Sequence, residues 1–264
     1  MVKIWFIYFA IGLFATVFGA VAGLGGGVII KPVLDLLGDY DVETIGILSA
    51  ATVLSMACVS LISSVKSKVQ INVKQSFILA IGSILGGIVG KFSFNYIVEW
   101  INVSDIVTVI QATMLGILMI LIYVLVRHRH SIKTYQLKSP YIIISIGFIL
   151  GVIAAFLGIG GGPFNVAVLA ILFSMNAKES ALNSIFIIFF SQISALLLST
   201  FTTGFASFNL TMLPFMIVGG ILGGLIGSRI AREISERIVG NIFLVGIVGI
   251  IFINIFNIVR FFVV

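Results

Sequence analysis

Long apolar runs separated by short polar links dominate this chain. From these runs we predict helices at residues 4–22, 28–37, 42–65, 74–97, 104–126, 140–157, 163–174, 178–200, 210–230 and 238–259. Eight of the runs approach the roughly 20 residues that a helix needs to cross a bilayer. The two others, 28–37 and 163–174, are shorter. A membrane β-barrel would show short segments of alternating polarity instead, so the pattern predicts an all-α, polytopic integral membrane protein.

Two clusters of glycine interrupt apolar regions where a continuous helix would otherwise be expected. The first is Gly-Leu-Gly-Gly-Gly at 23–27 and the second is Gly-Ile-Gly-Gly-Gly at 158–162. One glycine in a helix interior costs roughly 1 kcal/mol relative to alanine, so each cluster predicts a break. In hydrocarbon, freed backbone groups are tolerated only when they are buried in protein or line a cavity. Broken segments at matching places in two halves of a chain indicate the binding site of a transporter.

The two glycine clusters belong to an internal repeat. They match at an offset of 135 residues, and at that offset Ser49 falls on Ser184. A second glycine set follows in both halves at an offset of 137 residues: Gly82, Gly86, Gly87 and Gly90 match Gly219, Gly223, Gly224 and Gly227. Glycines spaced four apart on a helix favour tight packing of helices. We therefore predict two homologous halves, residues 1–126 and 140–264, joined by a basic cytoplasmic link at 127–139.

Composition also indicates a membrane protein. Of the 264 residues, 60% are hydrophobic and 9% are charged, and the mean hydropathy is +1.29, whereas soluble domains carry about 25% charged residues. The net charge of +6 does not indicate nucleic acid, because the basic residues lie in short links, where they orient membrane helices. Residues 4–22 look like a signal sequence. Since a similar segment recurs at 141–157, we expect a retained helix in a multi-pass protein of the cytoplasmic membrane.

The basic residues discriminate between two arrangements of the repeats. If each glycine break turns the chain back, eleven of the fifteen lie on the cytoplasmic side: Lys66, Lys68, Lys74, Arg127, Arg129, Lys133, Lys138, Lys178, Arg229, Arg232 and Arg237. If the chain instead continues across the membrane at each break, the repeats are parallel and nine lie there. Because cytoplasmic links are enriched in Lys and Arg, we prefer inverted repeats with the N-terminus outside. The segments 28–37 and 163–174 are then half-helices of re-entrant hairpins.

The glycine breaks are the first candidates for a binding site. A helix that begins after a break presents free N–H groups and the positive end of its dipole, which attract anions. Glycine also lets a ligand approach the backbone closely. We therefore predict that the substrate is bound by Gly25, Gly26, Gly27, Gly160, Gly161 and Gly162. The alternative is a tight crossing of helices through small residues.

Polar side chains near the breaks complete the candidate site. Lys31 is the basic residue close to a break, and a charge at membrane depth indicates function. Its alternatives are pairing with Asp35 one turn later or extension to the membrane interface. The further candidates are Ser49, Asn165, Asn183 and Ser184. Interhelical hydrogen bonding is the alternative for each of them, and the same role is preferred for Gln111 and Gln192.

The predicted spans offer no chemistry for an enzyme. They contain no Ser/His/Asp set and no zinc spacing, and the glycines lack the preceding strand of a nucleotide motif. We expect neither catalysis nor a cofactor. The leading hypothesis is a permease whose partners are a small anion and the lipid bilayer. A coupling ion and a homo-oligomer stay open. A non-transporting assembly or sensor protein is the alternative, although a simple anchor needs no paired broken helices.

The chain resembles the sulfite exporter TauE/SafE family. The resemblance rests on the glycine clusters at 23–27 and 158–162 with the proline that follows the second. It rests also on Gly-Gly-Ile-Val-Gly at 86–90 and Gly-Gly-Leu-Ile-Gly at 223–227. It covers nearly the whole chain and implies a permease of a bacterial or archaeal cytoplasmic membrane. The implied substrates are small anions, among them sulfite and sulfonated organic acids, and the implied site elements are the two glycine clusters.

Overall fold

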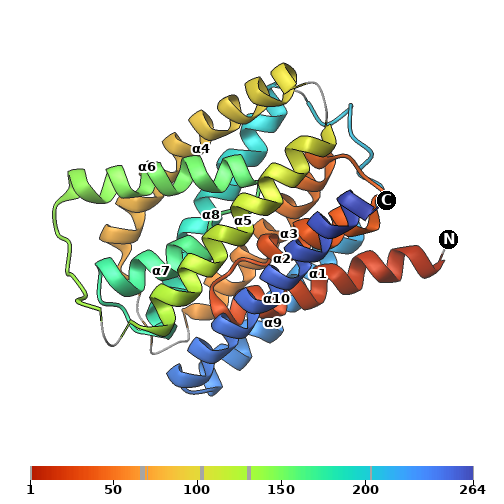
Figure 1. Ribbon diagram of the computed structural model, residues 1–264. Helices are drawn as coiled ribbons and strands as arrows, with labels where there is room; N and C mark the ends of the chain where they lie inside the picture. Colours follow the sequence, from red (N-terminus) through yellow and green to blue (C-terminus); the bar gives the residue numbers. More distant parts are fainter. Residues whose placement is uncertain are drawn as a thin grey trace.

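The computed structural model describes residues 2–65, 69, 71–101, 104–129, 132–202 and 204–263, where all regular secondary structure is helical (Figure 1). The helices are α1 (Val2–Ala22), α2 (Gly27–Leu37), α3 (Val42–Ser64), α4 (Val73–Ile101), α5 (Ser104–Arg127), α6 (Pro140–Leu157), α7 (Gly162–Leu172), α8 (Ala177–Thr202), α9 (Leu213–Glu233) and α10 (Glu236–Val263). Among the described residues, 8 helices are long and apolar enough to cross a membrane. The predicted polytopic all-α fold is confirmed. Lys66, Lys68 and His130 lie outside the described residues.

Each glycine break turns the chain back on itself. The residues just before α2 and α7 are glycines with φ of 78° and 76°, a left-handed conformation that glycine adopts far more readily than other residues. The Tyr8 hydroxyl, near the start of α1, donates to Asp39, beyond the end of α2, at 2.7 Å. In the second half, the N–H of Tyr135, before α6, donates to the carbonyl of Ile171 in the last turn of α7 at 2.9 Å. Therefore α1 with α2, and α6 with α7, form hairpins.

The spaced glycines join the two halves through two equivalent helix pairs. On α4, an added Cβ would clash with the α6 backbone at three successive turns: Gly82 at Ile144, Gly86 at Phe148 and Gly90 at Val152. On α9, the same holds against α1: Gly219 at Phe9, Gly223 at Leu13 and Gly227 at Val17. Each contact of α9 with α1 is the repeat counterpart of a contact of α4 with α6. Helix α9 corresponds to α4, and α1 corresponds to α6, so the two halves exchange their roles. Such reciprocity is the property of a two-fold interface, and in both pairs the helices run in the same direction.

Helix α9 also fixes the direction of α3. Gly220 lies against the carbonyl of Thr52, and Gly224 lies against the carbonyl of Met56. Further along, the Arg232 guanidinium donates to the Ser63 carbonyl at 2.8 Å. Residue numbers increase in the same direction along both helices, so α3 runs parallel to α9. Since α9 runs parallel to α1, α3 also runs parallel to α1. Two successive long helices can run the same way only because α2 returns between them.

The links between helices gather at opposite ends of the bundle. At one end, Gln75 at the start of α4 donates to the carbonyl of Leu137, before α6, at 3.1 Å. There too, Lys178 at the start of α8 donates to the carbonyl of Arg232 at the end of α9, also at 3.1 Å. We call this the basic end, since the link before α6 carries Arg129, Lys133 and Lys138 and the helix ends carry Lys74, Lys178 and Arg232. The opposite, acidic end holds the link between α2 and α3, where Asp41 caps α3 by accepting two backbone N–H groups.

The irregular backbone of the breaks lies at the centre of the bundle. Leu24 and Ile159, the apolar residues of the two breaks, are 0% and 1% exposed. Large apolar side chains cover the outside instead, with Phe6, Val245 and Phe252 each about two-thirds exposed. This distribution suits lipid, because non-helical backbone at membrane depth must be enclosed by protein.

We expect Gly86→Ala to lower the melting temperature of the purified protein. The added methyl group would overlap the Phe148 backbone of α6, and overpacking costs about 1–3 kcal/mol. Gly87→Ala is the matched control, because nothing lies within 4 Å of its new Cβ and alanine favours helix. Equal melting temperatures for the two variants would show that α4 and α6 do not pack through this face.

Candidate functional site

The two glycine breaks meet in the middle of the bundle and contact each other reciprocally. A Cβ on Gly27 would lie 3.2 Å from the Ile159 carbonyl oxygen, and a Cβ on Gly162 would clash with the Leu24 carbonyl. The repeat relates these two contacts, since Gly27 corresponds to Gly162 and Leu24 to Ile159. The Ser184 hydroxyl donates to the carbonyl oxygen of Gly23 at 2.7 Å and lies 3.3 Å from that of Gly162. A larger residue at Gly162 would therefore force the hairpins apart, whereas one at Gly27 would require a smaller shift of its neighbours.

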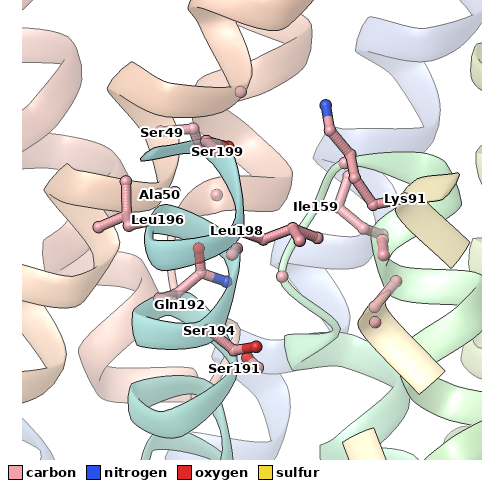
Figure 2. A pocket seen from close by; sticks show the side chains of 18 of the residues that line it. Ser49, Ala50, Lys91, Ile159, Ser191, Gln192, Ser194, Leu196, Leu198 and Ser199 are labelled. Carbon is pink, nitrogen blue, oxygen red and sulfur yellow. The ribbon is translucent and has the colours of Figure 1, made fainter. Parts of the chain in front are cut away.

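A cavity with an empty volume of about 1060 Å³ extends from the breaks toward the acidic end (Figure 2). We call it the central cavity. Its apolar walls come from α3, α4, α6 and α8, and its polar lining residues are Lys31, Glu43, Ser49, Ser83, Lys91, Gln111, Ser191, Gln192, Ser194 and Ser199. Figure 2 shows Gln192 on α8 directed toward the break loop that carries Ile159, and Lys91 on the far side of that loop. With two lysines and one glutamate, the charged lining has an excess of positive charge.

Lys31 connects α2 to the second glycine break. Its side chain is 5% exposed, and its Nζ donates to Gln111 Oε1 at 2.7 Å and to the Leu157 carbonyl at 2.9 Å. The Gln111 amide in turn donates to the Phe156 carbonyl at 2.5 Å. Lys31 thus satisfies the carbonyl end of α6, and it is buried in the protein and forms no hydrogen bond with Asp35. An ammonium group has three donors, so one remains for a ligand in the cavity.

Three buried polar side chains of the cavity wall have no protein partner. Ser49, Ser83 and Gln192 are 4%, 5% and 6% exposed, and none of them forms a hydrogen bond with another residue that the structure describes. Their polar atoms are not fully enclosed by protein, since among the described residues Asn257 Oδ1 is the one fully buried side-chain polar atom without a partner. Because these three line the cavity, water or a bound ligand is the partner available to them.

The predicted site residues divide into two groups. Gly27, Lys31, Ser49 and Gly160 line the central cavity, together with Gly158 and Ile159. The remaining predicted residues are not part of its wall: Gly25, Gly26, Gly161, Gly162, Asn165, Asn183 and Ser184.

Several residues outside the wall have a visible structural role. Gly26 and Gly161 precede α2 and α7 in the left-handed conformation. Asn183 accepts from the N–H of Asn72 at 2.9 Å and from the Ser76 hydroxyl at 2.6 Å, which joins α8 to α4. Asn165 is buried on α7 beside Gly161.

Sequence analysis missed Lys91 and Ser83 and gave Gln192 only a structural role. Lys91 follows Gly90 within a predicted span, and a lysine inside an apolar span is itself a signal for function. Its ammonium group lies 5.7 Å from the centre of the Phe94 ring. Gln111 does have the predicted interhelical role, because it joins α5 to Lys31 and to α6. Among the described residues, no three His, Cys, Asp or Glu side chains gather as a metal site would require.

Comparisons with known proteins identify the family of this chain. The family described as "Sulfite exporter TauE/SafE" matches residues 8–254. The chain is also similar to "Probable membrane transporter protein YunE" of Bacillus subtilis (strain 168), with 27% identity over 215 residues, 71% of this chain and 75% of the relative. No solved structure matches the chain. Because the family match spans nearly the whole sequence, this multi-pass membrane protein belongs to the sulfite exporter TauE/SafE family of membrane transporters.

Proposed function

We propose that this transporter carries a small anion, such as sulfite or a sulfonated or other organic acid, and binds it in the central cavity. The observation that carries the proposal is Lys31, a buried cation with one donor left for a ligand. A buried charge is costly unless it is paired. The hydrogen bonds from Lys31 reach neutral oxygens, and Asp35 attracts its charge without a hydrogen bond, so an anion in the cavity would form the direct charged contact that Lys31 lacks.

Neutral donors around Lys31 suit the oxygens of such an anion. The Gln192 amide and the hydroxyls of Ser49 and Ser83 face the same cavity without protein partners. The N–H groups of Gly27 and Val28, at the start of α2, have no acceptor among the described residues. Helix N-termini favour negative charge, and hydrogen bonds to an ionised ligand are stronger than neutral ones. The breaks thus contribute the N-terminus of α2 and the inner end of the cavity wall.

We further propose that the halves are inverted repeats with the basic end in the cytoplasm. The hairpin at each break and the parallel course of α1 and α3 support this arrangement. It places the link between α2 and α3 outside the cell, on the side toward which the central cavity extends. The anion therefore reaches Lys31 from outside in this conformation.

Cysteine labelling in intact cells tests the orientation. In a Cys58→Ser background, Lys74→Cys and Arg237→Cys should be protected from an impermeant thiol reagent, and Asn209→Cys should react. All three positions are exposed, so protection reports the membrane side. Labelling of Lys74→Cys and Arg237→Cys from opposite sides would establish parallel repeats.

Replacing Gln192 tests the binding site. Gln192→Leu keeps the size of the side chain but removes its donor, so we expect sulfite affinity to fall about tenfold or more, as for a lost hydrogen bond to a charged group. The melting temperature should stay unchanged, because the amide bonds no other described residue. Lys31→Gln should weaken binding further and also lower the melting temperature, since it loses the Leu157 contact. Calorimetry on purified protein measures both quantities.

Gln75→Leu provides the matched control at the basic end. Its amide donates to Leu137 at 3.1 Å, far along α4 from the central cavity. This variant should melt earlier and bind sulfite like the parent protein. If Gln192→Leu and Lys31→Gln also bind sulfite, methanesulfonate and acetate like the parent, the central cavity is not the anion site.

A further inference from the structure

A second, smaller cavity lies at the basic end of the bundle. Its empty volume is about 460 Å³, and α1, α3, α8, α9 and α10 contribute to its wall. The polar lining residues are Ser60, Ser63, Ser64, Lys178, Ser228 and Arg232. Its charged lining is entirely basic among these residues, and its inner end reaches Ala20 and Val21, close to the first glycine break.

The internal repeat relates this basic-end cavity to the central cavity. Each of the following pairs has one member in each wall: Ser60 with Ala195, Ser63 with Leu198, Ser64 with Ser199, Ala181 with Gly46, Ile185 with Ala50, and Ser228 with Lys91. The first five pairs have the offset of 135 and the last has the offset of 137. The two cavities are thus corresponding spaces of the two halves, located at opposite ends of the molecule.

The two corresponding spaces differ in extent, and contacts around Arg232 lie at the smaller one. The central cavity reaches both breaks, whereas the basic-end cavity is smaller and stops before Gly23. The Arg232 guanidinium donates to the Ser63 carbonyl at 2.8 Å and to its hydroxyl at 3.2 Å. Lys178 donates to the Arg232 carbonyl at 3.1 Å. These bonds hold together the ends of α3, α8 and α9 at the outer rim of the cavity.

We propose that the basic-end cavity is the closed half of the anion pathway and that Arg232 keeps it closed. This inference rests on the transport function proposed above. Two homologous halves can exchange conformations, so the space that is open in one half becomes the space that is closed in the other. When the bonds of Arg232 break, the basic-end cavity opens and the central cavity narrows. Arg232, Lys178 and the serines then form a second, transient binding site for the same small anion.

Thiol accessibility tests the coupling between the two cavities. Ser60→Cys and its repeat partner Ala195→Cys are made separately in a Cys58→Ser background, with the protein in nanodiscs so that a soluble maleimide reaches both ends. Ser60 is 2% exposed, so its cysteine should react slowly, and that at Ala195 should react fast. Adding Arg232→Ala should raise the Ser60→Cys rate about tenfold, the scale of one lost charged hydrogen bond, and lower the Ala195→Cys rate.

Several controls distinguish coupled movement of the two cavities from local loosening of the helices around Ser60. Arg229→Ala, an exposed arginine one turn earlier on α9, should change neither rate, and Arg232→Lys should change both less than Arg232→Ala. A faster rate at Ser60→Cys with an unchanged rate at Ala195→Cys would show local loosening and overturn the proposal, as would no change at either position. Sulfite binding to the parent protein is measured separately by calorimetry. Reciprocal changes without sulfite binding would support the closing contact and reject the proposed anion.

Discussion

The need to enclose unpaired backbone groups within protein determines this architecture. A helix that ends in hydrocarbon leaves N–H and C=O groups without partners, and this chain ends four helices at the centre of the bundle, two at each break. The breaks satisfy the constraint by burying each other: Gly27 lies against Ile159, and Gly162 lies against Leu24. Only residues without a side chain allow so close a crossing. The contact between the breaks joins the two hairpins. The direction of α3 follows from it, as does the pairing of α4 with α6 and of α9 with α1 across the two halves.

The same constraint explains why Lys31 can remain in the apolar interior. The last carbonyls of α6 need donors, and the Lys31 ammonium and the Gln111 amide provide them at Leu157 and Phe156. The negative end of a helix dipole also favours a nearby cation. A lysine that stabilises the fold is thereby held at the wall of the central cavity, with its charge available to a ligand. The structural role of Lys31 is therefore compatible with the binding role proposed above, since the same contacts place its ammonium group at the cavity wall.

Much of the fold could be predicted from the sequence, whereas less of the site could be. Apolar runs, glycine clusters and glycine spacing are local features, and they located the helices, the breaks and the packing face of α4. The partners of polar residues are set by tertiary structure, so no local feature distinguishes Asn183, which bonds Ser76 on α4, from Gln192, which faces the cavity. Lys91 did carry a signal, as a lysine within an apolar span, but a comparison of the basic residues in the links does not use it.

Two polar residues of the central cavity, Lys31 and Gln192, occupy positions where the two halves differ. At the repeat offset, Val166 corresponds to Lys31 and Ala57 corresponds to Gln192, so each of these two donors has an apolar counterpart in the other half, whereas Ser49 corresponds to Ser184. Residues that the halves share, above all the break glycines, build the crossing and the two spaces beside it. A strictly symmetric chain would have equal sites facing both ends. In the mechanism proposed above, Lys31 and Gln192 belong to one side, so the anion would be held best in one of two conformations and released when those contacts are lost in the other.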